Sequence, residues 1–335
     1  MTAKKIDIIN IFLIIISLIV AIKLPFELFL FSYAILGPLH YLTEIHWLHD
    51  KKYFVSTNKK WSIVFVVITL LIAIKPVVDF SGVELSESLK VVVNTIASHN
   101  KVYLLTAFLF AICLIFLKDF KKLTIALILV ILTSFVAVYY IPVVFVFMGV
   151  FLPTLIHVYI FTLLFILYGA IKSKSRYGFY LAALLFLVPF IISFISVDTL
   201  NYAPSEGTIE AFASSNIDNV SRVVSRILNG FQDEDFLVLS ELGIRIQIFI
   251  AFAYTYHYLN WFSKTSIIGW RKAMTKRNAF LILLIWIASI ALYLYDFRTG
   301  LIALFLLSFL HVLLEFPLNV ITIKEVFFLK RKKSN

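Results

Sequence analysis

The chain has 335 residues, of which 61% are hydrophobic and only 15% are charged, and its formal net charge is +11 at pH 7. Soluble globular proteins contain about a quarter charged and about half apolar residues, so this composition excludes an ordinary soluble protein. Cys113 is the single cysteine, which excludes an intramolecular disulfide and a thiolate metal site.

Apolar stretches long enough to cross a bilayer occur along most of the chain. A spanning helix needs about 20 predominantly apolar residues, with about 17 to 25 as the usual range. We predict ten spans, near residues 6–22, 25–47, 61–79, 102–117, 123–140, 143–171, 178–196, 243–262, 279–295 and 300–318. The predicted fold is an all-α, polytopic transmembrane helix bundle that forms one domain over residues 1–335.

The basic residues predict the orientation of these spans, because Lys and Arg are enriched in the cytoplasmic loops of membrane proteins. With the N-terminus inside, 22 of the 30 Lys and Arg residues fall in the inner segments, including Lys122, Arg176, Lys276 and the tail Lys330–Lys333. We therefore expect both termini in the cytoplasm. The positive charge then reflects topology and attraction to anionic lipids, and a nucleic-acid partner is not needed to explain it. We expect the inner membrane of a bacterium or archaeon.

Two long loops are predicted on the outer side, near residues 80–101 and 197–242. Both are mixed in charge. In the second loop, apolar residues recur at helical spacing between Ile217 and Leu228, and Gly230 is placed to end a helix there. We expect this amphipathic helix to lie on the membrane surface or to cap the bundle.

Four of the seven histidines lie inside predicted spans, namely His40, His157, His257 and His311. Each lies about 11 to 15 residues from the outer end of its span, which at about 1.5 Å per residue is a depth of roughly 17 to 23 Å. Ionisable side chains within spans are costly and usually mark function. A single histidine often only hydrogen-bonds a neighbouring helix, but four at one depth predict a metal site in the bundle core.

Two glutamates accompany these histidines at helical spacing. Glu44 is four residues after His40, and Glu315 is four residues after His311, so each pair shares a helix face. Each carboxylate can bind the same metal or orient the imidazole through a hydrogen bond; a local Glu–His contact without a metal is the alternative. Asn260, three residues after the third of these histidines, is a candidate for orienting a substrate or a bound water.

The donor set limits the identity of the metal. Neutral imidazoles suit iron, zinc, copper or nickel, and the lack of cysteine ligands argues against a thiolate-type copper site. Iron favours oxygen chemistry, whereas zinc favours hydrolysis through a bound hydroxide. The donor residues by themselves leave both possibilities open.

Three short segments around the histidines resemble the motifs of a known family. Residues 38–44 resemble an early Pro-His-Gly-x-x-Asp motif, residues 309–315 a late Pro-His-x-x-x-x-Asp segment, and residues 256–261 a histidine-rich penultimate motif. These motifs are those of the Brp/Blh family, membrane-embedded β-carotene 15,15′-dioxygenases that make retinal. The resemblance implies one non-haem iron held by four histidines, with His157 as the remaining ligand by position.

From the residues and the resemblance together, we expect a membrane-embedded non-haem metal oxygenase, with Fe(II) as the expected ion and Zn as the alternative. Its substrate would be a lipid-soluble isoprenoid, carotenoid or other lipid that arrives sideways from the bilayer past Tyr254, Tyr258 and Trp261. The rival interpretation is a transporter or channel in which His and Glu relay protons or cations. A polytopic scaffold without chemistry is a third interpretation.

Overall fold

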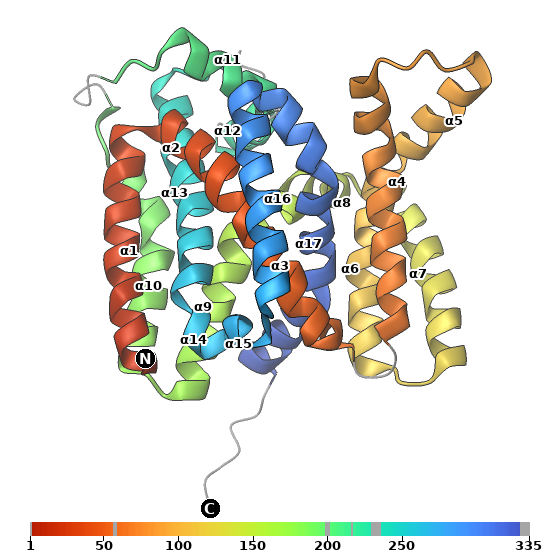
Figure 1. The fold of residues 1–335 in the computed structure, drawn as a ribbon, viewed down its shortest axis with the longest axis horizontal. Helices are drawn as coiled ribbons and strands as arrows, with labels where there is room; N and C mark the ends of the chain where they lie inside the picture. Colours follow the sequence, from red (N-terminus) through yellow and green to blue (C-terminus); the bar gives the residue numbers. More distant parts are fainter. Residues whose placement is uncertain (1, 56–58, 198–201, 216, 229–235, 329–335) are drawn as a thin grey trace, which may run out of the picture. The chain divides into compact units, whose positions relative to one another are not determined.

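A computed structural model describes residues 2–55, 59–197, 202–215, 217–228 and 236–328 (Figure 1). It is 88% helical, and these described residues form no strand. The predicted all-α polytopic bundle is therefore confirmed. The basic tail Lys330–Lys333 and Gly230, the predicted end of an outer-loop helix, lie outside the described residues.

Eight helices within the described ranges are long and apolar enough to cross a membrane, and there are up to nine if one bent pair acts as a single span. The eight are α1 (Ala3–Lys23), Pro25–Asp50 with α2 (Pro25–Phe31) and α3 (Gly37–Asp50), α4 (Ser62–Ser81), α7 (Phe120–Tyr140), Phe147–Ser173 with α9 (Thr162–Ser173), α10 (Arg176–Ser193), α16 (Lys276–Tyr295) and α17 (Phe297–Phe327). The bent pair is α5 (Glu87–Ser98) and α6 (Asn100–Phe116), which meet at 45°.

The predicted span near residues 243–262 lies in α13 (Glu241–Ser263), which is not among these eight helices. Its second half carries tyrosine, histidine and asparagine side chains, which lower its hydropathy. Sixteen of its 23 residues are buried. A helix that other helices surround does not have to present apolar side chains to lipid, so its sequence tolerates more polar residues. The absence of α13 from the eight helices and the bend between α5 and α6 account for the difference between the ten predicted spans and the eight or nine found.

The first helix shows how a span divides its surface between protein and lipid. Its buried residues recur every three or four positions, which places them on one face: Ile6, Asn10, Ile14, Ser17 and Ala21. Large apolar side chains occupy the other face and are exposed, among them Phe12, Ile16 and Ile19. An extended apolar surface of this kind is suited to contact with the hydrocarbon of a membrane.

The chain divides into two compact units. The first consists of Met1–His40 and Thr154–Leu301, and the second of Tyr41–Pro153 and Ile302–Asn335. The division falls within three helical stretches, which are α3, the π-helical residues Phe147–Phe161 and α17. The expected single domain stays a prediction.

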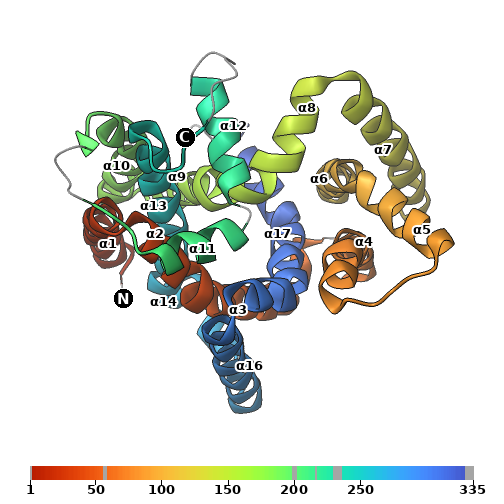
Figure 2. The ribbon, with the colours of Figure 1, turned by 90° about the horizontal axis from the view of Figure 1, so that it is seen from above.

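In the first unit, α13 lies among α1, α2, α9 and α10 (Figure 2). It also packs against a π-helical turn, Ser32–Leu36, that joins α2 to α3. Two helices from the predicted outer loop also belong to this unit: α11 (Glu206–Ser214) packs on α2, and α12 (Asp218–Leu228) packs on α13. The predicted helix between Ile217 and Leu228 is thus confirmed as α12. Two short helices, α14 (Thr265–Ile268) and α15 (Trp270–Ala273), lead from α13 to α16.

In the second unit, α6 packs against α4 and α7, and α5 leads from α4 to α6 (Figure 1). The predicted outer loop near residues 80–101 therefore contains a helix. Short 3₁₀ turns at Lys52–Phe54 and Lys59–Trp61 follow α3, and α8 (Pro142–Val146) follows α7. The same unit holds most of α3 and α17, which carry the two glutamates of interest.

Candidate metal centre

Two of the predicted ligands lie in or shortly after π-helical stretches. The π-helical turn Ser32–Leu36 leads into α3, which carries His40. His157 lies within a second π-helical stretch, Phe147–Phe161, that also contains Pro153. Hydrogen bonds from residue i to i+5 widen such turns. π-Helical turns are rare in proteins, and those that occur are often found at functional sites. His157 therefore lies within π-helical backbone, and His40 follows a π-helical turn that changes the direction in which α3 presents its side chains.

Three histidines of the first unit lie together in its interior. His40, His157 and His257 are 1%, 2% and 6% exposed. The ring of His257 is 4.6 Å from that of His40 and 5.0 Å from that of His157, measured between ring centroids. The Nε2 atoms of His40 and His257 are 3.1 Å apart. Helices far apart in the sequence thus bring three imidazoles to one place.

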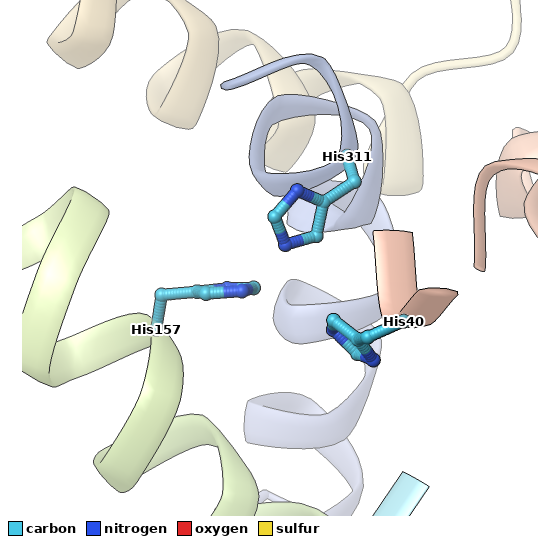
Figure 3. A group of neighbouring side chains, drawn as sticks. All are labelled: His40, His157 and His311. Atoms are coloured by element: carbon cyan, nitrogen blue, oxygen red, sulfur yellow. The ribbon is translucent and has the colours of Figure 1, made fainter. Parts of the chain in front are cut away.

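A group of three buried histidines, His40, His157 and His311, can hold a metal ion. Each offers one ring nitrogen, and these nitrogens all lie within 4.8 Å of one another. Figure 3 shows these three neighbouring side chains. The chemistry of this donor set fits a first-row divalent metal such as iron or zinc, which neutral imidazole nitrogens bind well.

His257 is not in that three-histidine group, yet its position agrees with a ligand role. With metal–nitrogen bonds of about 2.1 Å, two imidazole nitrogens on one ion are about 3.0 Å apart at a 90° angle and about 3.4 Å apart at the tetrahedral angle. Nε2 of His257 and Nε2 of His40 are 3.1 Å apart, which lies within this range. The same distance also suits a direct hydrogen bond between two neutral imidazoles. Its role as fourth ligand therefore stays a prediction, and metal binding to the variant proteins tests it.

The two predicted glutamates lie in the second unit and are both buried, at 2% exposure for Glu44 and 3% for Glu315. They are near enough to each other to interact electrostatically. In the same unit, the ring of Tyr41 lies 5.7 Å from that of His311. Two buried carboxylates at short range require compensation by hydrogen bonds, a proton or a cation. The roles of Glu44 and Glu315 as ligands or as orienting groups stay predictions.

The aromatic residues predicted to line a substrate path fall into two groups. Tyr258 and Trp261 contact His40, with ring centroids 5.1 and 5.5 Å away. Tyr254 instead packs against Phe29 and Tyr33, 5.4 and 5.9 Å away. The first two residues therefore form part of the surroundings of the histidines, while Tyr254 belongs to the aromatic core further toward α2.

Asn260 is buried one turn after His257, as its predicted role requires. Its side-chain oxygen has no hydrogen-bond partner among the residues that the structure describes. A buried amide oxygen normally accepts a hydrogen bond, so a water or a ligand is its expected partner. The predicted role in orienting a substrate or a water stays a prediction.

Two residues near the histidines had no signal in the sequence. Thr162, at the start of α9, places its hydroxyl oxygen 2.7 Å from Nδ1 of His257. Gly37 lies against Tyr258, whose hydroxyl oxygen would be 3.3 Å from a Cβ atom added to the glycine. Threonine and glycine are common in ordinary spans, and only the position of α13 shows what these two residues contact.

Comparisons of the chain with protein-family models, curated proteins and solved structures found no match. The functional argument therefore rests on the residues and their arrangement.

Proposed function

We propose that this membrane protein is a metalloenzyme, a non-haem iron oxygenase that acts on a lipid-soluble isoprenoid, carotenoid or related lipid. The observation that carries the proposal is the group of buried histidine nitrogens from His40, His157 and His311. Ionisable side chains inside membrane-spanning helices are rare, and a group of three from separate stretches of the chain is better explained by a shared ligand than by separate packing needs.

Four residues would hold the ion: the three histidines of that group and His257. Iron is favoured over zinc by the resemblance of the histidine segments to the Brp/Blh motifs, and an imidazole donor set is compatible with both ions. Bound ferrous iron would supply the chemistry by which oxygen reacts with the substrate. The protein's own contribution would be to position the ligands, to hold the substrate beside them and to keep water out.

The surrounding side chains suit an apolar substrate. The rings of Tyr258 and Trp261 lie next to His40, and both are buried. Aromatic rings offer broad apolar contact surfaces. A substrate dissolved in the bilayer would reach a buried site without crossing water. Glu44 and Glu315 would orient His40 and His311 through the shared face of their helices.

A second candidate function, a proton or cation relay in a transporter, is favoured by one feature of α17. His311, Glu315 and Asn319 follow one another at intervals of four residues, so they form a polar stripe along one helix face. Asn319 is 1% exposed, and neither amide atom has a hydrogen-bond partner in the described part of the chain. A polar stripe along a membrane helix is also what an ion path requires.

Elemental analysis of the purified protein separates the two functions. A metalloenzyme should contain close to one iron atom per chain, or one zinc atom if the alternative ion is the natural one. The content should fall close to zero in His157→Ala. It should be unchanged in His99→Ala, because His99 instead contacts the rings of Phe135 and Tyr139. Equal metal content in all three proteins, or none in any, would exclude the metalloenzyme and leave the relay.

A further inference from the structure

Thr162 makes two contacts through one hydroxyl group. The residue is buried at the start of α9, five positions after His157. Its hydroxyl donates a hydrogen bond to the carbonyl oxygen of Val158 at 2.9 Å. The same oxygen lies 2.7 Å from Nδ1 of His257. All four residues belong to the first unit.

These two contacts determine which ring nitrogen of His257 carries the proton. A hydroxyl group has one hydrogen to donate and two lone pairs. Since Thr162 donates its hydrogen to the Val158 carbonyl, its oxygen can only accept from Nδ1 of His257. Neutral imidazole carries one proton, so Nδ1 is the protonated nitrogen and Nε2 of His257 presents a lone pair. That lone pair faces Nε2 of His40, 3.1 Å away.

We propose that Thr162 is a positioning residue of the metal centre: it holds His257 in the tautomer whose Nε2 carries the lone pair that would bind the ion. This inference rests on the proposed metal centre and adds the residue that prepares its fourth ligand. Metal-binding histidines almost always donate their other ring N–H to an acceptor, which sets both the tautomer and the ring orientation. A hydroxyl acceptor is uncharged, so it orients the imidazole without adding negative charge to the site.

The alternative is that the hydroxyl serves only the helix, as threonines in apolar spans often do by bonding the carbonyl four residues earlier. Thr69 is a matched control for this alternative. It is fully buried in α4, and its hydroxyl donates to the Phe65 carbonyl at 2.8 Å. Thr69→Val removes a helix back-bond, and Thr162→Val removes a helix back-bond together with the acceptor for His257.

The test measures binding of Co²⁺ to the full chain in detergent, because cobalt replaces iron or zinc and its visible absorption bands report the ligand geometry. Loss of an outer hydrogen bond to a metal-binding histidine typically weakens metal affinity by about 10- to 100-fold. We expect this loss, with altered absorption bands, in Thr162→Val. Thr162→Ser keeps the hydroxyl and should bind as the wild type does, and so should Thr69→Val. Combining Thr162→Val with His257→Ala should add no loss to that of His257→Ala alone.

The outcomes separate this inference from the proposed function. If the wild type binds Co²⁺ and Thr162→Val matches it in affinity and absorption, the positioning role is wrong and the metal centre stands. If Thr162→Ser binds as weakly as Thr162→Val, the hydroxyl is not responsible and the inference is also wrong. If the wild type binds no Co²⁺, both proposals fall together. Should Thr162→Val not fold, Thr162→Ala removes the same hydroxyl without adding a methyl group and takes its place.

Discussion

The Nε2 atoms of His40 and His257 face each other across 3.1 Å in the interior of the first unit. Without an ion, one of the two imidazoles must donate a hydrogen to the other at this distance. With an ion bound, both nitrogens can turn their lone pairs to the metal, at the separation expected of two ligands. The pair therefore has two states that differ by the presence of a cation.

The first prediction concerns removal of the metal. A ligand that binds only the folded protein stabilises it by an amount that grows with concentration, about 4 kcal/mol at 1,000 times the dissociation constant. We expect a chelator to lower the thermal unfolding temperature of the wild type in detergent, and added Fe(II) or Zn²⁺ to restore it. His157→Ala should unfold at a temperature that neither chelator nor metal changes. A chelator effect of equal size in that variant would show that the histidines are not the ligands.

The second prediction separates ligand from orienting group at the glutamates. If Glu44 and Glu315 only orient their histidines, Glu44→Gln and Glu315→Gln should retain much of the metal and lose about 10- to 100-fold in activity or affinity. His40→Ala and His311→Ala should lose both metal and activity. Glutamine keeps the size and one acceptor oxygen, so the comparison isolates the charge. Gln variants as empty of metal as the His variants would make the carboxylates ligands.

The third prediction concerns Gly37 and Tyr258. An alanine Cβ at position 37 would lie 3.3 Å from the hydroxyl oxygen of Tyr258 and 3.5 Å from its Cζ, so the hydroxyl is the closest obstacle. We expect Gly37→Ala to destabilise the wild type by about 1 to 3 kcal/mol, the usual range for overpacking. In a Tyr258→Phe background the obstacle is gone, and the same change should stabilise α3 by up to about 1 kcal/mol through helix propensity.

Thermal unfolding of the wild type, Gly37→Ala, Tyr258→Phe and the double variant measures the effect of Gly37→Ala on stability in each background. An equal effect of Gly37→Ala in both backgrounds would mean that Tyr258 does not press on the start of α3. The Tyr258 ring lies 5.1 Å from the ring of His40. If Gly37→Ala changes the metal content of the protein with Tyr258 but not of the protein with Tyr258→Phe, the contact between residues 37 and 258 also positions His40.

The fourth prediction tests the topology. Reporter fusions ending at Lys122, Arg176 and Lys276 should give a cytoplasmic signal, because the basic inner segments hold these residues. A fusion within residues 205–230 should report the outer side. If that loop reports the cytoplasm instead, the four histidines do not share one depth, and the argument from depth for a metal site is wrong.

The helical class and the positions of the apolar helices could be predicted from the amino-acid sequence. Apolar runs of about 20 residues require backbone hydrogen bonds within one segment when they lie in lipid, so length and composition are sufficient to locate them. The histidines and glutamates were also recognisable, because ionisable residues are out of place in such runs. The helix of the second outer loop, α12, followed from apolar spacing alone.

The contacts between side chains of different helices follow from the packing of the helices and could not be predicted from the sequence. The π-helical stretches at Ser32–Leu36 and Phe147–Phe161 change the direction of every side chain after them, so counting residues from a span end cannot orient His40 or His157. The crowded position of α13, which allows its polar residues, depends on helices from distant parts of the chain. The contact of Thr162 with His257 joins residues 95 positions apart, and no local pattern encodes it, since a hydroxyl bonded to its own helix looks the same with or without a histidine beside it.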